Sequence, residues 1–442
     1  MNVLIQASQL ILSLSLLIIL HEAGHFIPAR LFKIRVEKFY LFFDPWFSLF
    51  KFKRGETEYG IGWLPLGGYV KIAGMVDESM DKEQMKEPAK DWEFRSKPAW
   101  QRLIVMLGGV TVNIILGFLI YMMIAFVWGV TTLPMESAKY GAVFDPVALH
   151  LGFKNGDKIL TVDGKKVESF DEIGSKIGLD QAKNVLVERN GTQVTIVIPD
   201  TFIQKSVLKK KEVRKGFITP AFPFVVDNFA PVSPAKTAGI LKGDQIIAVN
   251  GDSMRFYDEF SPMVKPMAGK SIKLGVLRNG QKSTIDVTVT AEGFIGVAPV
   301  TPDKFLTFKT KHFSFLESIP EGFELGSDKL SSYVKQFKFV FTQEGVKQIG
   351  GFGTFGSLFP PVWDWASFWN LTAFISIILA FMNILPIPAL DGGHVMFLLY
   401  EMITRRKPNQ KVMEYAQLAG MVLLLALFVY ANGNDIFRHF RN

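Results

Sequence analysis

The sequence predicts a multi-pass α-helical membrane protein with four transmembrane helices, a membrane-associated β-hairpin and two external α+β domains. Three observations predict this class: long apolar runs without charge, an internal repeat between the second and third runs, and a length too great for one core. Hydrophobic residues make up 49% of the 442 residues, and 40 residues are Phe. This composition is typical of a membrane protein with a soluble part.

Four apolar segments are candidates to cross a bilayer. They run from about Val3 to the HEAGH motif at 21–25, and over residues 103–130, 368–390 and 415–430. We expect the first to be a helix rather than a signal peptide, since no basic residue precedes Arg30 and no small-residue cleavage site follows. Basic residues gather between the first and second spans and between the third and fourth, so both loops are expected in the cytoplasm. Both termini and residues 131–367 are then expected on the periplasmic side.

Charge and cysteine content limit the partners and the metal chemistry. The formal net charge is +8, but the basic residues flank apolar runs instead of forming a compact arm. We therefore expect membrane lipid as a partner and no nucleic acid. Cysteine is absent, so any metal must be bound by His, Asp, Glu or water.

Residues 131–305 contain an internal repeat. GDKILTVDG at 156–164 recurs as GDQIIAVNG at 243–251, and VERNG at 187–191 recurs as VLRNG at 276–280. A period near 87 residues is too long for a solenoid, so we expect a duplicated small domain. The pattern resembles PDZ domains, which capture peptides by adding a strand to a sheet edge. A rigid spacer or size filter without a bound peptide is the alternative.

The repeat divides the chain into five expected segments. They are residues 1–130 with two spans, the metal motif and the hairpin, 131–220 and 221–305 with the PDZ-like domains, 306–365 as an amphipathic surface region, and 366–442 with the last two spans. An amphipathic helix is expected over 328–345, where one apolar stripe contains Leu330, Val334, Phe337 and Phe341. We expect this helix along the outer membrane surface, and a plain packing helix is the alternative.

The first span ends in an ionisable cluster, HEAGH at 21–25. Charged groups are costly in hydrocarbon, so such residues are functional candidates. Positions i and i+4 share a helix face, so His21 and His25 can present two imidazoles to one ion. Glu22 lies beside them and can take a proton from water. Zinc suits two histidines and a carboxylate, and a His–Glu pairing that serves only packing is the alternative.

A hydrolytic zinc site keeps three protein ligands and one open position, so a third ligand is required. Four acidic residues lie near the apolar segments: Asp364, Asp391, Glu401 and Asp435. We favour Asp391, because NILPIPALDGGH at 383–394 breaks the third span with two prolines and sets this carboxylate among glycines. His394, three residues later, is the alternative ligand.

These motifs resemble the site-2 protease family of intramembrane zinc metalloproteases. HEAGH in the first span and NILPIPALDGGH in the third carry the resemblance, which covers nearly the whole chain. LPLGGYVKIAG at 64–74 and GGVTVN at 108–113 also match, although Val110 stands where proline is usual. YLFFDPWFSLF at 40–50 is longer and more aromatic than the Gly-rich stretch of the family.

The resemblance implies zinc-dependent hydrolysis of peptide bonds at the bacterial inner membrane. His21, His25 and Asp391 would hold zinc, and Glu22 would be the general base. The implied substrates are transmembrane segments of single-pass membrane proteins, including an anti-sigma factor and remnant signal peptides. The active site would lie toward the cytoplasmic side.

A helical substrate must be opened before its carbonyls can be attacked. Residues 48–64 are expected to form a hairpin turning at 54–56, which would hold the unwound substrate as an added strand. Residues expected to contact the substrate are Gly67, Gly68, Tyr69 and, from the resemblance, Asn383. The alternatives are an ordinary cytoplasmic hairpin and an Asn383 amide that pairs with carbonyls freed by the prolines.

Two other functions are considered beside proteolysis. A PDZ-bearing membrane scaffold, or a quality-control factor with a structural metal site, would cleave nothing. A zinc transporter would need ligands along a path through the membrane, whereas the sequence has one cluster near one side.

Overall fold

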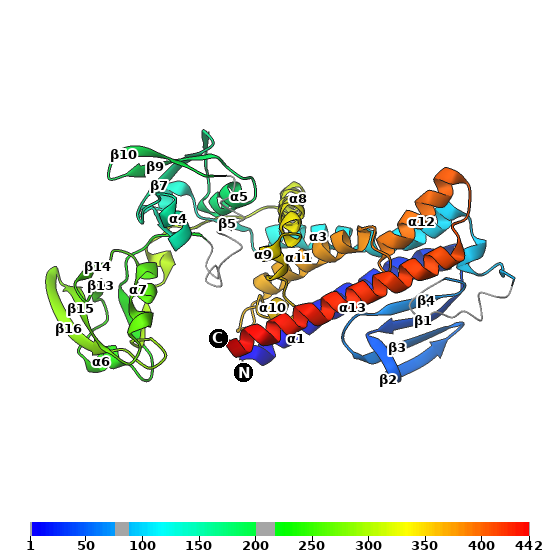
Figure 1. Cartoon of the computed structure of the whole chain (residues 1–442), viewed down its shortest axis with the longest axis horizontal. Coiled ribbons are helices and arrows are strands. Elements are labelled where there is room, and N and C mark those ends of the chain that lie inside the picture. Colours follow the sequence, from blue (N-terminus) through cyan, green and yellow to red (C-terminus); the bar gives the residue numbers. More distant parts are fainter. Residues whose placement is uncertain (1, 76–87, 200–216, 442) are drawn as a thin grey trace. The chain divides into compact units, whose positions relative to one another are not determined.

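A computed structural model gives the fold of the chain (Figure 1). It describes residues 2–75, 88–199 and 217–441. Residues 76–87 of the expected cytoplasmic loop and residues 200–216 of the expected first PDZ-like domain lie outside the described residues.

The chain divides into two units. One consists of Met1–Gly129 together with His312–Asn442, and is here called the helical unit. The other is Val130–Lys311, here called the inserted unit. The helical unit is therefore built from both ends of the sequence, so the HEAGH and LDGG motifs belong to one unit.

Four helices in the described part of the chain are long and apolar enough to cross a membrane, as the apolar segments predict. They are α1 (Asn2–Leu31), α3 (Ala99–Val127), α11 (Trp365–Ile384) and α13 (Gln410–Arg441). The α3 helix contacts both α1 and α11, so it is central in the helical unit. The predicted multi-pass helical class is confirmed.

Glycines let α1 and α3 approach closely at the level of the HEAGH motif. A β-carbon on Gly24 would collide with the backbone of Gly108, and one on Gly108 would collide with the Gly24 carbonyl. Small residues at a helix crossing bring the two backbones into contact. The crossing sets one turn of α3 against the helix face that carries the two histidines.

The third apolar segment forms a shorter helix than residues 368–390. α11 ends at Ile384, and Leu385 has an extended conformation. Pro386 explains this end, because it lacks the N–H that a helix needs and disfavours helical conformation at the preceding residue.

A new helix, α12 (Asp391–Thr404), begins at the carboxylate of the LDGG motif. Ala389, just before it, has a φ of 75°, a left-handed conformation that is strained for a residue with a β-carbon. The two prolines and this strained residue together place Asp391 in the first turn of α12.

The segment between α1 and α3 folds into a four-stranded sheet that contains the predicted hairpin. Its strands are β1 (Val36–Leu41), β2 (Phe43–Arg54), β3 (Thr57–Leu64) and β4 (Tyr69–Ile72), in the order β2-β3-β1-β4. β2 and β3 are the hairpin, turning at Gly55 and Glu56. β1 pairs parallel with β3 and antiparallel with β4. Among the residues that the structure describes, β4 is therefore an edge strand with one paired side.

The amphipathic helix expected over residues 328–345 is longer in the structure and begins and ends earlier. α8 (Phe315–Val340) begins at a capping box, in which Ser314 and Glu317 accept each other's backbone N–H. Phe341 follows its last residue and is exposed. The buried residues of α8 are Ser318, Gly322 and Gly326. The two glycines lie against α3, so α8 packs on the protein partly through small residues.

Two short helices connect α8 to α11. They are α9 (Gln343–Val346) and α10 (Phe352–Gly356). The C-terminal half of α13 contacts α10, where Asp435 accepts the N–H groups of Gly351 and Thr354 at 2.9 Å. This contact holds the end of α13 on the helical unit.

The inserted unit contains one fold twice. The first copy consists of β6 (Ala142–Phe144), α4 (Pro146–His150), β7 (Lys158–Val162), β8 (Lys165–Lys166), α5 (Ile173–Gly178), β9 (Asn184–Arg189) and β10 (Thr192–Val197). The second consists of β12 (Val226–Phe229), α6 (Pro234–Thr237), β13 (Gln245–Val249), β14 (Asp252–Ser253), α7 (Tyr257–Val264), β15 (Ser271–Arg278) and β16 (Gln281–Thr288). The sheet orders β8-β7-β9-β10 and β14-β13-β15-β16 are the same. The sequence repeat is thus a structural repeat.

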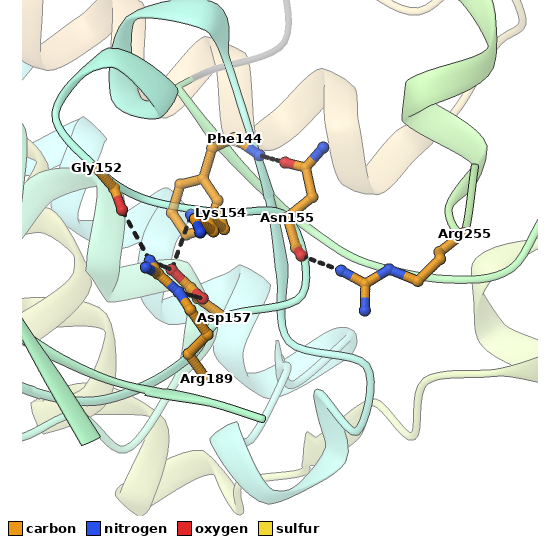
Figure 2. A network of polar contacts seen from close by, with 7 residues as sticks. All are labelled: Phe144, Gly152, Lys154, Asn155, Asp157, Arg189 and Arg255. Atoms are coloured by element: carbon orange, nitrogen blue, oxygen red, sulfur yellow. Dashed lines mark hydrogen bonds and ion pairs between the residues drawn. The ribbon is translucent and has the colours of Figure 1, made fainter. Parts of the chain in front are cut away.

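Each copy contains the same ion pair, between a buried aspartate and a partly exposed arginine, which explains why two separate motifs are repeated. Arg189 donates to both oxygens of Asp157 and to the carbonyl of Gly152 (Figure 2). Arg278 donates to both oxygens of Asp244 in the second copy. Both aspartates are 1% exposed. Hydrogen bonding to Arg278 holds the pKa of Asp244 below its ordinary value.

The two copies contact each other through the first copy's Asn155. Its side chain donates to Glu259 at 2.7 Å, and its carbonyl accepts from Arg255 (Figure 2). Phe256, the next residue, is buried in an apolar cluster with Val143 of the first copy. The copies are therefore joined by polar and apolar contacts within one unit.

The two ends of the inserted unit are paired strands. β5 (Val130–Thr132) runs antiparallel to β18 (Lys309–Lys311), with Thr131 opposite Thr310. Two remaining short strands complete the copies: β11 (Ile218–Pro220) pairs with β6, and β17 (Val297–Pro299) pairs with β12. The chain therefore leaves and rejoins the helical unit through one two-stranded ribbon.

Candidate metal centre and cavity

One face of α1 carries both histidines of the HEAGH motif. Nε2 of His21 and Nε2 of His25 lie 3.3 Å apart, as the i, i+4 spacing predicts. Gly109 of α3 provides the space, since a β-carbon there would collide with both imidazoles. The glycines of α3 thus allow both the helix contact and the position of the histidines.

Asp391 completes a three-residue cluster. Its Oδ2 lies 3.3 Å from Nε2 of His21 and 3.3 Å from Nε2 of His25. Two ligands about 2.0–2.1 Å from a tetrahedral zinc ion lie roughly 3.3 Å apart, so these atoms fit such an ion. The same Oδ2 is buried without a hydrogen-bond partner, and a cation here would satisfy it. Among the described residues this is the one group of His, Asp and Glu close enough to hold a metal.

The other acidic candidates have structural contacts. Asp364 caps the first turn of α11, Asp435 caps α10, and Glu401 pairs with Arg102 at 2.5 Å. His394, the alternative ligand, lines the same cavity as the cluster but does not belong to it. The geometry therefore favours Asp391 as the third ligand.

Contacts on α3 orient the two histidines. Nδ1 of His25 lies 2.8 Å from the Val105 carbonyl, so an N–H there leaves Nε2 free. Nδ1 of His21 lies 3.2 Å from the amide nitrogen of Asn113, whose Oδ1 is buried without a partner. A half-turn of this amide pairs Oδ1 with an N–H on Nδ1 and satisfies both atoms. Both imidazoles then direct a free Nε2 toward Asp391.

A cavity of about 620 Å³ lies beside the cluster. Its wall includes the three candidate ligands, Glu22 of α1, the edge strand β4, and parts of α12 and α13. A β-carbon on Gly68 would collide with Ile18 and lie 3.4 Å from Cγ of Glu22, so the backbone before β4 passes close to the candidate base. The cavity therefore joins the three candidate metal ligands, the Glu22 carboxylate and the outer edge of β4.

The four predicted substrate contacts are not all in this wall. Gly68 and Tyr69 line the cavity, whereas Gly67 and Asn383 are not among its described lining residues. Asn383 instead lies beside the cluster, with Nδ2 3.4 Å from Nε2 of His21, the nitrogen that faces Asp391. The structure thus brings Asn383 to the candidate metal ligands and Gly68 and Tyr69 to the cavity.

The aromatic stretch at 40–50 supports the cavity wall. The hydroxyl of Tyr69 donates to Oδ1 of Asp44 at 2.8 Å, and Ser48 donates to the other oxygen at 3.0 Å. The Tyr69 ring stacks on Tyr40, with centroids 5.3 Å apart. Burial and the neighbouring Asp44 carboxylate raise the pKa of Tyr69, which keeps its hydroxyl a donor. This departure from the family pattern therefore shapes the cavity.

Sequence reasoning assigned no role to Asn113 or Gln417. Asn113 lies behind His21, and Gln417 of α13 lines the cavity. Asn113 and Gln417 are polar amide side chains within otherwise apolar helices. Asn383 was singled out as a candidate for the same reason. A polar amide in an apolar span is therefore the sequence feature that points to Asn113 and Gln417 as well.

The His–His–Asp cluster, the adjacent glutamate and the four apolar helices are the features of a metal-dependent hydrolase of a membrane. Comparison with known sequences agrees. The model of peptidase family M50 matches residues 9–427, and the chain belongs to this family.

Relatives cover nearly the full length of the chain. Salmonella typhimurium "Regulator of sigma-E protease RseP" is 28% identical over 472 residues, spanning 99% of this chain and 100% of the relative. Haemophilus influenzae "Regulator of sigma E protease" is 26% identical over 466 residues, with the same two shares. Neisseria meningitidis "Putative zinc metalloprotease" is 29% identical over 451 residues, spanning 97% of this chain and 98% of the relative.

These relatives confirm the predicted resemblance to the site-2 protease family, including its regulator-of-sigma-E members. The chain is a zinc metalloprotease of that family. The scaffold and transporter alternatives are therefore set aside.

Proposed function

We propose that the chain cleaves transmembrane segments of single-pass membrane proteins at the cluster of His21, His25 and Asp391. The observation that carries the proposal is one cavity lined by these three residues, by Glu22 and by the edge strand β4. An extended peptide can pair with a free strand edge through its backbone, whatever its side chains. A substrate paired with β4 would pass both the ligands and Glu22.

Each residue then has a chemical role. His21, His25 and Asp391 hold zinc, which when bound polarises the scissile carbonyl and lowers the pKa of the attacking water. Glu22 accepts the proton of that water and returns it to the leaving amine. The backbone of Gly67, Gly68 and Tyr69 and the amide of Asn383 hold the extended substrate.

The biological setting follows from the relatives and the charge distribution. Relatives named regulators of sigma-E protease support an anti-sigma factor as substrate, and remnant signal peptides share its single apolar segment. The chain would act in the bacterial inner membrane. Its basic loops would be cytoplasmic and the inserted unit periplasmic. The duplicated domains would be PDZ-like modules that filter substrates by size or bind peptide.

A single substitution tests the chemistry. Glu22→Gln should retain zinc and lose cleavage of a single-pass substrate, because the ligands stay and the base is removed. Loss of a general base typically lowers the rate by about 10²–10⁴-fold. Glu56→Gln is the matched control, since that exposed glutamate of the hairpin turn pairs only with the exposed Arg30. Near-normal cleavage by purified Glu22→Gln protein would refute the mechanism.

The substrate class has its own test. Membrane proteins that accumulate in host cells carrying Glu22→Gln should be compared with those in cells carrying the wild-type chain. An accumulating anti-sigma factor or signal-peptide remnant would support the respective substrate. Accumulation of neither, despite cleavage of a test substrate in vitro, would refute these substrate assignments.

A further inference from the structure

α13 has little contact with the rest of the helical unit, so its few buried residues are informative. Three of its described residues are buried: Gln417, Gly420 and Ala431. Glycine and alanine at helix contacts are expected, because they let backbones approach. Gln417 is 9% exposed, although it is long and polar.

Gly420 fixes where Gln417 lies. A β-carbon on Gly420 would collide with the carbonyl and ring of Pro388, so α13 touches the loop before Asp391 at this point. Gln417 is one turn earlier on the same helix face. It lines the cavity together with Ala389 and Asp391, which follow that proline.

The Gln417 amide makes no hydrogen bond to any described residue. A buried amide without a partner is unfavourable, and more so among apolar helices than at a wet surface. The atoms of Gln417 are not among the fully inaccessible unpaired polar atoms, so the amide reaches the cavity. Its partner is therefore expected to be a molecule that enters this cavity.

The chemistry of that partner follows from β4. A peptide paired with the free edge of β4 would bond to it through alternate backbone groups, and the others would point away. Those remaining N–H and C=O groups need hydrogen-bond partners inside the cavity. A glutamine amide offers both a donor and an acceptor, like a peptide group.

We propose that Gln417 binds the backbone of the extended peptide substrate beside Asp391. Its amide would pair with the peptide N–H and C=O groups that point away from β4. This inference rests on the proposed intramembrane proteolysis. It makes α13 part of the substrate-binding site through a residue outside the HEAGH and LDGG motifs. The contact is with backbone, so it serves substrates of different sequence.

The test uses Gln417→Met, which keeps the length of the side chain and removes its polar atoms. In the Glu22→Gln background, where substrate binds without being cut, affinity for a single-pass peptide in detergent micelles should fall about tenfold. In the active chain, KM should rise while zinc content stays unchanged. Gln410→Met is the matched control, because Gln410 lies exposed on the same helix and pairs with Glu414. It should bind substrate normally.

Several outcomes would overturn the inference. Unchanged affinity in Gln417→Met would refute the contact, and loss of zinc would show that Gln417 acts on Asp391 instead. If Gln417→Met unfolds, Gln417→Ala removes the amide without a steric conflict and must show the same loss of affinity. If the wild-type chain cuts no single-pass substrate, the proposed function itself fails. If it cuts normally and Gln417→Met binds normally, only the Gln417 contact fails.

Discussion

Asn113 is the residue on which the tautomer of His21 depends. The carboxamide is fully buried in α3, and its oxygen has no hydrogen-bond partner until the amide is turned to place it on Nδ1 of His21. An oxygen facing Nδ1 of His21 fixes the proton there and leaves Nε2 as the ligand atom. Val105 does the same for His25 through a backbone carbonyl, which no side-chain substitution can remove. A substitution can therefore test the hydrogen bond that orients His21, but not the one that orients His25.

Asn113→Leu should weaken zinc binding about 10–100-fold, because outer hydrogen bonds of this kind contribute that much to metal affinity. Competition with a chelator would measure the affinity. The absorption spectrum of the cobalt-substituted protein would report any change in ligand geometry. Asn113→Asp keeps an oxygen acceptor and should restore part of the affinity. Equal zinc affinity in Asn113→Leu and the wild-type chain would contradict this role.

At the scale of elements, the contact of α13 with the proline loop should control the position of Asp391. Gly420→Ala forces a β-carbon onto Pro388, so α13 or the loop must shift. Overpacking typically costs about 1–3 kcal/mol, and here it should also lower zinc retention. Gly433→Ala is the control on the same helix, since nothing lies within 4 Å of its added β-carbon. Thermal unfolding and zinc content in micelles would distinguish the two variants, and equal behaviour would contradict the prediction.

The second copy of the inserted unit should lose stability in acid through one carboxyl group. The pKa of Asp244 is held below its ordinary value of 3.8 by Arg278. A lowered pKa in the folded state means that the ionised form stabilises the fold above about pH 4 and that this contribution is lost as pH falls. The protection of β13 and β15 amides from hydrogen exchange, corrected for intrinsic rates, should therefore decrease as pH falls.

Substitutions at this pair provide the control. Asp244→Asn should destabilise the copy near neutral pH, and its difference from the wild-type chain should shrink in acid. Arg278→Met leaves the buried Asp244 carboxylate without its partner and should also destabilise the copy near neutral pH. Asp252→Asn changes an exposed carboxylate in the same copy and should have little effect. A constant difference between Asp244→Asn and wild type across pH would refute the assignment.

Local patterns predicted the elements that local sequence determines. The four spans, the Gly55 turn and the i, i+4 histidines follow from composition and spacing. The start of α8 was also readable, since Ser314 and Glu317 form a capping box in sequence. The parallel pairing of β1 with β3, and the burial of Gln417 against the proline loop, depend on residues far apart in the chain. No periodicity encodes such contacts, so the sequence alone could not predict them.

At the scale of the whole molecule, the loop charges make a prediction about orientation. Cysteines introduced at Lys90 and Lys407, both exposed, should react with an impermeant reagent only after spheroplasts are lysed. Cysteines at Lys165 and Lys282 in the inserted unit should react in intact spheroplasts. The chain has no cysteine of its own, so labelling has no background. The opposite pattern would invert the proposed topology.

The pairing of β5 with β18 has a consequence for how such a chain can change over evolution. Thr131 and Thr310 lie opposite each other, with their hydroxyls 2.8 Å apart. The residues between them are therefore an inserted segment, here called the cassette, whose two ends lie next to each other. A cassette of this kind can be lost, exchanged or duplicated internally without rerouting the helices that hold His21 and Asp391. The two copies present here share one sheet order and one repeated sequence pattern, as an internal duplication would leave them. The number of copies in the inserted unit is thus free to vary while the helices that carry His21 and Asp391 keep their sequence constraints.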